Sequence, residues 1–455
     1  MIHPRGGAAP SPRPRPFSRG VYLNIASPVP GLTVHDWSEQ RWADYLDNIR
    51  EVGADTLTFY LWQDILSDFE STRERREPNR RLHERLRDVI AWARKRRLRT
   101  SFLMTPTFVP RPIFERHPEL RAPIEYVEHG FSCICPSRDA TWPLLERYVD
   151  HEWGWFHTAD AFQLWFYDPG GCVCDRCTAD LCAPLLRQAD VVSKRVWAKN
   201  PSAKFEISFW PVWAWEQILK RKFGEELLDR LHKHFGERSR EITIVDSAEG
   251  DEAFLEEAKA RGFRTQAFLF SANVETPFAF LHPLPTYFQQ MAERVHAKEL
   301  DGAFLHALYP GSKELNTLVG LRALDVRNHG NKPAALYDAA RIYLKDRRCA
   351  DQVVPLLQRW ETVLAGGKPD PKTLQRLVDD LENALATAPA AQADVLLTSV
   401  RAVLVLASEP EATRAAKLET LLENSPMFRG FAKQAAAQHA SLARFVHDGW
   451  DKVHF

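Results

Sequence analysis

Eight short apolar runs alternate with segments of helical period through residues 21–330. The runs begin at Val21, Thr56, Arg99, Ala161, Lys204, Glu241, Arg264 and Gly302. Strict alternation of strand and helix requires a parallel sheet, because each helix must return the chain to the same edge. Eight repeats over this length favour a closed (β/α)8 barrel of the α/β class over an open doubly wound sheet. No glycine-rich phosphate fingerprint follows any of the runs, which also disfavours a dinucleotide-binding sheet.

The composition changes after about Asn331, where Ala, Leu, Arg and Glu recur at helical spacing. Breaks occur at Gly366-Gly367, Pro369, Pro389 and Pro410. We therefore predict three parts: a disordered Pro/Arg-rich tail over residues 1–20, a catalytic barrel over 21–330, and a C-terminal helical domain over 331–455. The last would be a bundle of about five helices that packs on the barrel or forms a homodimer contact.

Bulk charge and hydropathy exclude several classes of partner. Sixty basic residues balance sixty acidic ones, so there is no global electrostatic attraction to nucleic acid or to a membrane. No run reaches the roughly 18 apolar residues of a membrane span. The N-terminal segment lacks the apolar core of a signal peptide. We expect a cytoplasmic protein that binds neither nucleic acid nor membrane.

Polar and aromatic residues collect where the predicted strands end, which is where barrels of this kind place their active sites. The strand-end residues are Asn24, Trp62, Asp64, Tyr167, Asp168, Trp210, Trp213, Asp246, Glu249, Asn273, Glu275, His306 and Tyr309. Sugar hydroxyls need paired donors and acceptors, and sugar C–H faces stack on aromatic rings. The set therefore indicates a carbohydrate site. We predict that Asn24, Trp62, Tyr167, Trp210, Asn273, His306 and Tyr309 bind the sugar.

Three carboxylates could carry glycoside hydrolysis, which needs one acid for the leaving oxygen and a second carboxylate as base or nucleophile. Asp168 is the candidate acid, because the aromatic strand before it could raise its pKa. Asp246 and Glu275 are candidates for activating water, with Glu249 and Asp64 in reserve. The alternative for each is a solvated or salt-bridged carboxylate. A barrel that binds carbohydrate without cleaving it is the competing function.

Six of the seven cysteines lie between Cys133 and Cys182. Cys172, Cys174 and Cys177 supply three thiolates, and tetrahedral zinc needs four ligands. Cys135 is the preferred fourth ligand, with Cys133 and Cys182 as alternatives. We predict a structural zinc and no organic cofactor; free or locally disulfide-bonded thiols are the alternative. A closed four-sulfur site has no open position for water, so the metal would stiffen the loop that carries Asp168. A catalytic metal is the weaker possibility.

Two motifs and a closing segment resemble a known group of barrels. The motifs are Cys-Pro-Ser from Cys135 and Gly-Gly-Cys-x-Cys-x-x-Cys from Gly170. The closing segment is the eighth strand and its helix, which opens with Glu314, Leu315 and Asn316. Over roughly Val21 to Leu344 the chain resembles the glycoside hydrolases that include bacterial α-glucuronidases and β-N-acetylhexosaminidases. It is most similar to uncharacterised bacterial relatives that carry these motifs.

The resemblance implies a mechanism. In the α-glucuronidases an acid follows the fourth strand, and two later carboxylates position water for an inverting reaction. Asp168, Asp246 and Glu275 match that order, although the acid there is a glutamate. The hexosaminidases use adjacent acidic residues after the fourth strand, whereas Pro169 follows Asp168 here. The resemblance thus favours an exo-acting, inverting enzyme over substrate-assisted catalysis.

Overall fold

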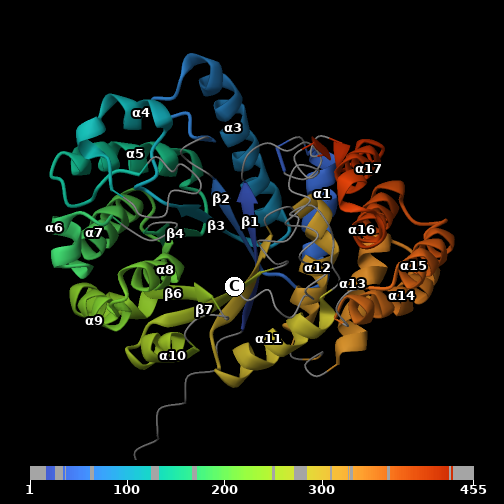
Figure 1. Cartoon of the computed structure of the whole chain (residues 1–455). Helices are drawn as coiled ribbons and strands as arrows, with labels where there is room; N and C mark the ends of the chain where they lie inside the picture. Colours follow the sequence, from blue (N-terminus) through green and yellow to red (C-terminus); the bar gives the residue numbers. More distant parts are fainter. Residues whose placement is uncertain are drawn as a thin grey trace, which may run out of the picture.

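The computed structural model contains a closed ring of eight parallel strands (Figure 1). It describes residues 17–25, 34–35, 37–61, 66–123, 133–166, 172–247, 252–270, 284–307, 310–325, 327, 331–365, 369–429 and 432–433. The strands follow one another around the ring in chain order, from β1 to β8. The predicted (β/α)8 barrel is confirmed.

The eight strands have closely similar lengths. They are β1 (Ser18–Ile25), β2 (Thr56–Leu61), β3 (Arg99–Met104), β4 (Ala161–Trp165), β5 (Lys204–Ser208), β6 (Ile242–Ser247), β7 (Arg264–Phe270) and β8 (Gly302–Ala307). The ring closes where β1 pairs with β8, with Ser18 opposite Gly302. A Cβ added at Gly302 would lie 2.6 Å from the Ser18 carbonyl oxygen, so this seam requires glycine.

Helices surround the ring. Those in the barrel are α1 (Glu39–Glu51), α3 (Arg73–Lys95), α4 (Arg111–Arg116), α5 (Thr141–Phe156), α6 (Asp175–Ala179), α7 (Cys182–Lys199), α8 (Trp210–Leu219), α9 (Gly224–Phe235), α10 (Glu252–Ala260), α11 (Pro285–Ala297) and α12 (Pro310–Ala323). The described residues also form two 3-10 helices: η1 (Pro118–Leu120) follows α4, and η2 (Gly236–Glu241) connects α9 to β6. Ser38 is the N-cap of α1, because its side chain accepts a hydrogen bond from the Arg41 backbone N–H.

Strand residues alternate between two cores, because successive side chains of a strand point to opposite faces. In β4, Phe162 and Leu164 belong to the core between strands and helices, whereas Trp165 belongs to a separate cluster inside the ring. The inner cluster comprises Tyr22, Tyr60, Leu103, Trp165, Val245, Phe268 and Phe304. The barrel interior is therefore packed with side chains, as such barrels require.

Five helices follow the barrel in the part of the chain that the structure describes. They are α13 (Lys332–Leu344), α14 (Arg347–Ala365), α15 (Pro371–Ala384), α16 (Ala390–Ser408) and α17 (Glu411–Glu423). Drawn from orange to red, they lie together on one side of the molecule, and α13 contacts α1 and α12 (Figure 1). The bundle thus continues the helical layer of the barrel on that side.

Among the described residues, α16 is the one helix long and apolar enough to cross a membrane by length and composition, contrary to the expectation that no run reaches this length. Core helices of soluble proteins pass the same test. Val395, Leu396 and Val403 of α16 are buried, and the helix contacts α15 and α17. These contacts bury 44% of the apolar window within the bundle.

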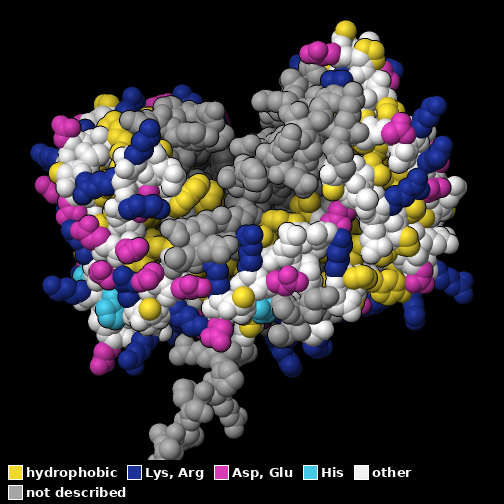
Figure 2. Space-filling view, turned by 60° about the horizontal axis from the view of Figure 1, so that its bottom comes forward, with side chains coloured by type: hydrophobic (Ala, Val, Ile, Leu, Met, Phe, Trp, Pro, Cys, Tyr) yellow, Lys and Arg dark blue, Asp and Glu magenta, His cyan; other side chains and the backbone are white. Residues whose placement is uncertain are grey.

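Surface charges are mixed. On the face shown in Figure 2, Lys and Arg side chains of the described residues are interspersed with Asp and Glu. This distribution agrees with the balanced composition of the chain. It gives that face no strong electrostatic attraction of one sign.

Candidate active site and metal centre

Asn24 and His306 meet at the carboxyl-terminal end of the barrel. Asn24 is the next-to-last residue of β1 and His306 the next-to-last of β8. The closing seam therefore brings them together, although 282 positions separate them. The Asn24 Nδ2 lies 3.5 Å from the His306 Nε2. With Asn24 Nδ2 as the donor, His306 Nε2 accepts and the ring proton lies on Nδ1. The imidazole also lies 4.5 Å from the Tyr22 ring, centroid to centroid.

Burial lowers the pKa of His306 to about 3 from an ordinary 6.5. The folded protein therefore binds fewer protons at this site than the unfolded chain between these two values. The stability associated with His306 is lost as pH falls from about 6.5 towards about 3. We predict that His306 stays neutral from pH 5 to 8, so that its ring resonances in a histidine-labelled NMR titration do not move. A titration midpoint near 6.5 would contradict this assignment.

Aromatic rings form the floor beneath this pair. Tyr22, Tyr60 and Trp165 stack on one another, with ring centroids 5.7 to 6.2 Å apart. Trp210, the first residue of α8, packs edge-on against Phe268, with ring centroids 5.6 Å apart. It also stacks on Trp213 of the same helix, with ring centroids 5.1 Å apart. Aromatic packing is therefore continuous from the barrel interior to α8. Trp210 and Trp213 are the partly exposed rings of this group, and such rings can contact sugar C–H groups.

Asp246 lies beside this surface rather than in the barrel interior. Its neighbour Val245 points into the inner cluster, so alternation along β6 turns Asp246 towards the helices. Its side chain is buried, and Oδ1 accepts a hydrogen bond from the Ser247 backbone N–H at 2.8 Å. Asp246 lines a cavity of about 300 Å³ with Phe209, Val212, Trp213, Glu216, Lys222, Phe223, Gly224, Glu225, Glu226 and Phe254. This cavity is large enough for a small ligand.

Glu216, another carboxylate of this cavity, already has structural partners. Its Oε1 accepts hydrogen bonds from the backbone N–H groups of Phe223 and Gly224, both at 2.7 Å. Its other oxygen lies 3.2 Å from the Lys222 ammonium. Glu216 therefore caps the start of α9, where a carboxylate satisfies the first free N–H groups of a helix. Glu216 therefore has a structural role at this end of α9.

The predicted site residues divide into two sets. Asn24, Trp210, Asp246 and His306 lie within the described structure, and Trp62, Asp64, Tyr167, Asp168, Glu249, Asn273, Glu275 and Tyr309 lie outside the described residues. The structure brings Asn24 together with His306. Trp210 stacks on Trp213, and Trp213 lines the same cavity as Asp246. Tyr22 and Trp165, whose rings lie beside this site, are not among the predicted site residues. Their inward register in β1 and β4 was the available signal.

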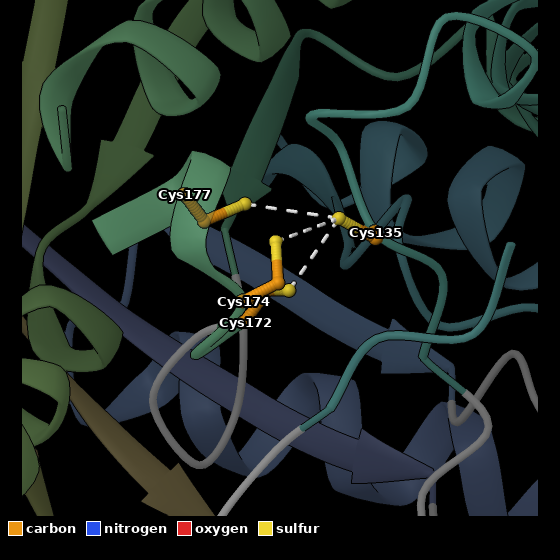
Figure 3. Close-up of side chains that lie close together, drawn as sticks. All are labelled: Cys135, Cys172, Cys174 and Cys177. Carbon is orange, nitrogen blue, oxygen red and sulfur yellow. Dashed lines mark hydrogen bonds between the residues drawn. The ribbon is translucent and has the colours of Figure 1, made fainter. Parts of the chain in front are cut away.

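The sulfurs of four cysteines converge near the start of α6 (Figure 3). Cys135 comes from the chain after β3, and Cys172, Cys174 and Cys177 come from the start of α6 and the residues before it. All four sulfurs lie within 4.8 Å of one another, and all are free thiols. Of the alternatives, Cys182 lies elsewhere, with its sulfur 3.8 Å from the Phe223 carbonyl oxygen.

The spacing of these sulfurs fits a tetrahedral metal. Cys135 Sγ lies 3.4, 3.6 and 3.7 Å from the sulfurs of Cys172, Cys174 and Cys177. Zinc bound at about 2.3 Å to four sulfurs would hold them about 3.8 Å apart. A disulfide would need about 2.05 Å. The four residues thus have the donor chemistry and nearly the spacing of a four-sulfur zinc site.

Hydrogen bonds among the thiols distribute their protons unevenly. The bonds from Cys172 and Cys177 lower the pKa of Cys135, because they stabilise its thiolate. Donating to Cys135 raises the pKa of Cys177 to about 12. A thiophilic cation takes the place of such protons when it binds, since thiolates are its ligands.

A second cluster of potential ligands is explained by ion pairs. Asp68, His151 and Glu152 converge between α3 and α5. Asp68 Oδ1 lies 2.7 Å from His151 Nε2, and Glu152 Oε2 lies 3.1 Å from His83 Nε2. Although burial of His83 opposes its charge, Glu152 raises the His83 pKa. These pairs satisfy the cluster without a metal.

Neither a protein-family model nor a curated protein sequence matches the chain. Solved structures do match it. Thermobaculum terrenum O-GlcNAc hydrolase, in a mutant form, is 12% identical with a TM-score of 0.52, and the match covers 95% of this chain and 94% of that one. CpGH89 from Clostridium perfringens, in complex with its substrate GlcNAc-α-1,4-galactose, is 11% identical with a TM-score of 0.55. That match covers 94% of this chain and 53% of CpGH89. These likenesses place the chain in the class of (β/α)8 barrels.

Proposed function

We propose that the protein is an exo-acting glycoside hydrolase that inverts the anomeric centre, as an α-glucuronidase does. The observation that carries the proposal is the pairing of Asn24 and His306 above a floor of stacked aromatic rings, at the end of the barrel where catalysis occurs. A neutral imidazole and an amide supply the donors and acceptors that sugar hydroxyls require. The rings supply the apolar contact surface.

The reaction needs two carboxyl groups with different protonation states. We assign the general acid to Asp168, and the activation of water to Asp246 or Glu275. An inverting pair stands about 6.5–9.5 Å apart, whereas a retaining pair stands about 5–5.5 Å apart. Asp246, buried in its cavity beside Trp213, is the described member of this set. The structural neighbours support the assignment of class, because the two matched barrels are glycoside hydrolases.

A non-catalytic, carbohydrate-binding barrel is the second candidate. The observation in its favour is the placement of Asp246 on the helix side of β6, away from His306. A hexosaminidase-like retaining enzyme is a further alternative within the hydrolases, and the structural neighbours with GlcNAc in their names favour it.

One pair of measurements separates binding from catalysis. Isothermal calorimetry with uronic acids and N-acetylhexosamines detects binding, and a panel of α- and β-linked aryl glycosides detects turnover. A hydrolase releases the aryl group from at least one member of the panel. Sugar binding without release from any member would establish the non-catalytic alternative.

We further propose that Cys135, Cys172, Cys174 and Cys177 hold a structural zinc ion. Four protein ligands leave no open coordination position, so the ion would supply rigidity and no chemistry. The site ties the chain after β3 to the chain after β4, since Cys172 lies six residues beyond Phe166. The centre would therefore anchor the far end of the segment that carries Asp168. We expect the activity to be unchanged in a chelator too weak to remove the zinc, because a structural ion takes no part in the reaction. The zinc content and the activity are measured on the same sample.

A further inference from the structure

Lys313 lies at the same end of the barrel as His306. It belongs to the first turn of α12, and only Leu308 and Tyr309 separate that helix from β8. Because each helix of the barrel starts at the carboxyl-terminal end of the preceding strand, this turn lies at the mouth. Lys313 is 2% exposed. Its Nζ has no hydrogen-bond partner among the described residues.

Lys313 lies on the face of α12 that is turned towards the barrel. Gly320 marks this face, because a Cβ added there would lie 2.4 Å from Leu305 of β8 and 3.0 Å from Phe288 of α11. Seven residues make almost two helical turns, so Lys313 shares this face about 10 Å nearer the helix start. Side chains of a helix lean towards its N-terminus. The amine is therefore carried towards the rim of the barrel.

The adjacent acid does not neutralise Lys313. Glu314 is fully buried, and its two oxygens accept hydrogen bonds from Arg41 at 2.5 Å and from Asn48 at 2.8 Å, both on α1. Glu314 is thus committed to joining α12 to α1. Burial lowers the pKa of Lys313 to about 7, and no charged group among the described residues offsets this effect.

The position itself is unfavourable for a cation. The N-terminus of a helix carries partial positive charge, which attracts anions and repels an ammonium group. Buried polar groups in folded proteins almost always have partners. Lys313 is buried at this pole without a partner among the described residues, and a negative group that arrives from outside best explains its position. An anion would satisfy both the amine and the first turn of the helix.

We propose that Lys313 binds a negatively charged substituent of the sugar ligand, a carboxylate, sulfate or phosphate group, and so selects acidic sugars. This inference rests on the proposed carbohydrate function and names the residue that sets its substrate class. The Lys313 ammonium, near the start of α12, would bind the charged group of the sugar, and Asn24 and His306 would contact its neutral hydroxyls.

Calorimetry on the full-length, zinc-loaded protein tests the proposal. The probes are glucose, glucuronate, glucose 6-sulfate and glucose 6-phosphate, and the variants are Lys313→Met and Lys313→Arg. We expect the wild type to bind at least one acidic sugar at least tenfold more tightly than glucose. Lys313→Met should lose this preference and keep its affinity for glucose, while Lys313→Arg should retain part of the preference. The acidic probe that binds best identifies the charged group.

Three results would overturn the proposal: equal affinity for glucose and every acidic probe, no binding of any acidic probe, or an unchanged preference in Lys313→Met. Lys332→Met is the matched control, because the Lys332 amine lies on the nearby helix α13 and is paired with Glu361 at 2.8 Å; its preference should equal that of the wild type. Turnover of aryl glycosides is scored separately. A protein that hydrolyses neutral glycosides without preferring acids keeps the proposed function and loses this inference.

The melting temperature of Lys313→Met distinguishes a role in binding from a purely structural role. Methionine has nearly the length of lysine and no buried amine to leave unpaired. Lys313→Met is therefore expected to melt at the wild-type temperature or above it, as residues kept for function often cost stability. A melting temperature several degrees lower would assign Lys313 to the scaffold and overturn its role in binding.

Discussion

Asp168→Asn is expected to lower kcat on substrates with poor leaving groups by about 10²–10⁴-fold, the usual contribution of general acid catalysis. Asparagine has nearly the shape of aspartic acid but cannot release a proton to the leaving oxygen. The loss should shrink for dinitrophenyl glycosides, whose leaving group needs little protonation. Comparing kcat across a series of aryl leaving groups measures this dependence and separates an acid from a residue that only orients the sugar.

The melting temperature of Asp168→Asn should match that of the wild type, since asparagine has nearly the same shape and volume as aspartic acid. Asp139→Asn is the matched control, because the Asp139 side chain is 90% exposed and should leave kcat unchanged. Full activity in Asp168→Asn would remove this residue from the mechanism. A loss of equal size for every leaving group would assign it a different role.

Cys135→Ser is expected to lose the bound zinc and a large part of the stability that the metal provides. Structural zinc contributes about 10–16 kcal/mol to the folding of zinc-finger peptides. Here the barrel supplies most of the scaffold, so we expect the free energy of unfolding to fall by several kcal/mol. Plasma emission spectroscopy gives the zinc content, and denaturant titration gives the stability.

Cys349→Ala provides the control for this experiment. Cys349 is also buried, but it lies in α14 with its sulfur 3.2 Å from the Ala384 carbonyl oxygen, far along the chain from the cluster. Its variant should keep one zinc per chain. Undiminished zinc in Cys135→Ser, or a wild-type protein purified under reducing conditions without a thiophilic metal, would refute the zinc centre.

The barrel could be predicted from the sequence because its signal is repeated. Each strand is a short apolar run, each helix has one apolar face, and eight such units in chain order leave few alternatives to ring closure. The boundaries of the strands were predicted less accurately, since β1 starts at Ser18 and not at Val21. Ser18 owes its place in the strand to its pairing with Gly302, a contact that spacing along the chain does not reveal.

The candidate site was only partly accessible to the same reasoning. A strand end locates a residue at the mouth, but the direction of its side chain depends on register, which sets Asp246 apart from His306. Lys313 gave no pattern in the sequence, because its significance lies in burial without a partner. The cysteine spacing indicated three ligands and favoured Cys135 as the fourth. The structure brings the Cys135 sulfur to the other three and places the Cys182 sulfur elsewhere.

The central claim is that the mouth of this barrel cleaves a glycosidic bond, and proton NMR of the freshly released sugar tests it most directly. The spectrum recorded in the first minutes shows both that the bond is broken and which anomer forms before mutarotation. We predict cleavage of an α-linked glycoside with release of the β-anomer, and no release by Asp168→Asn. A zinc-loaded protein that binds these sugars yet leaves every α- and β-linked glycoside intact would contradict the account.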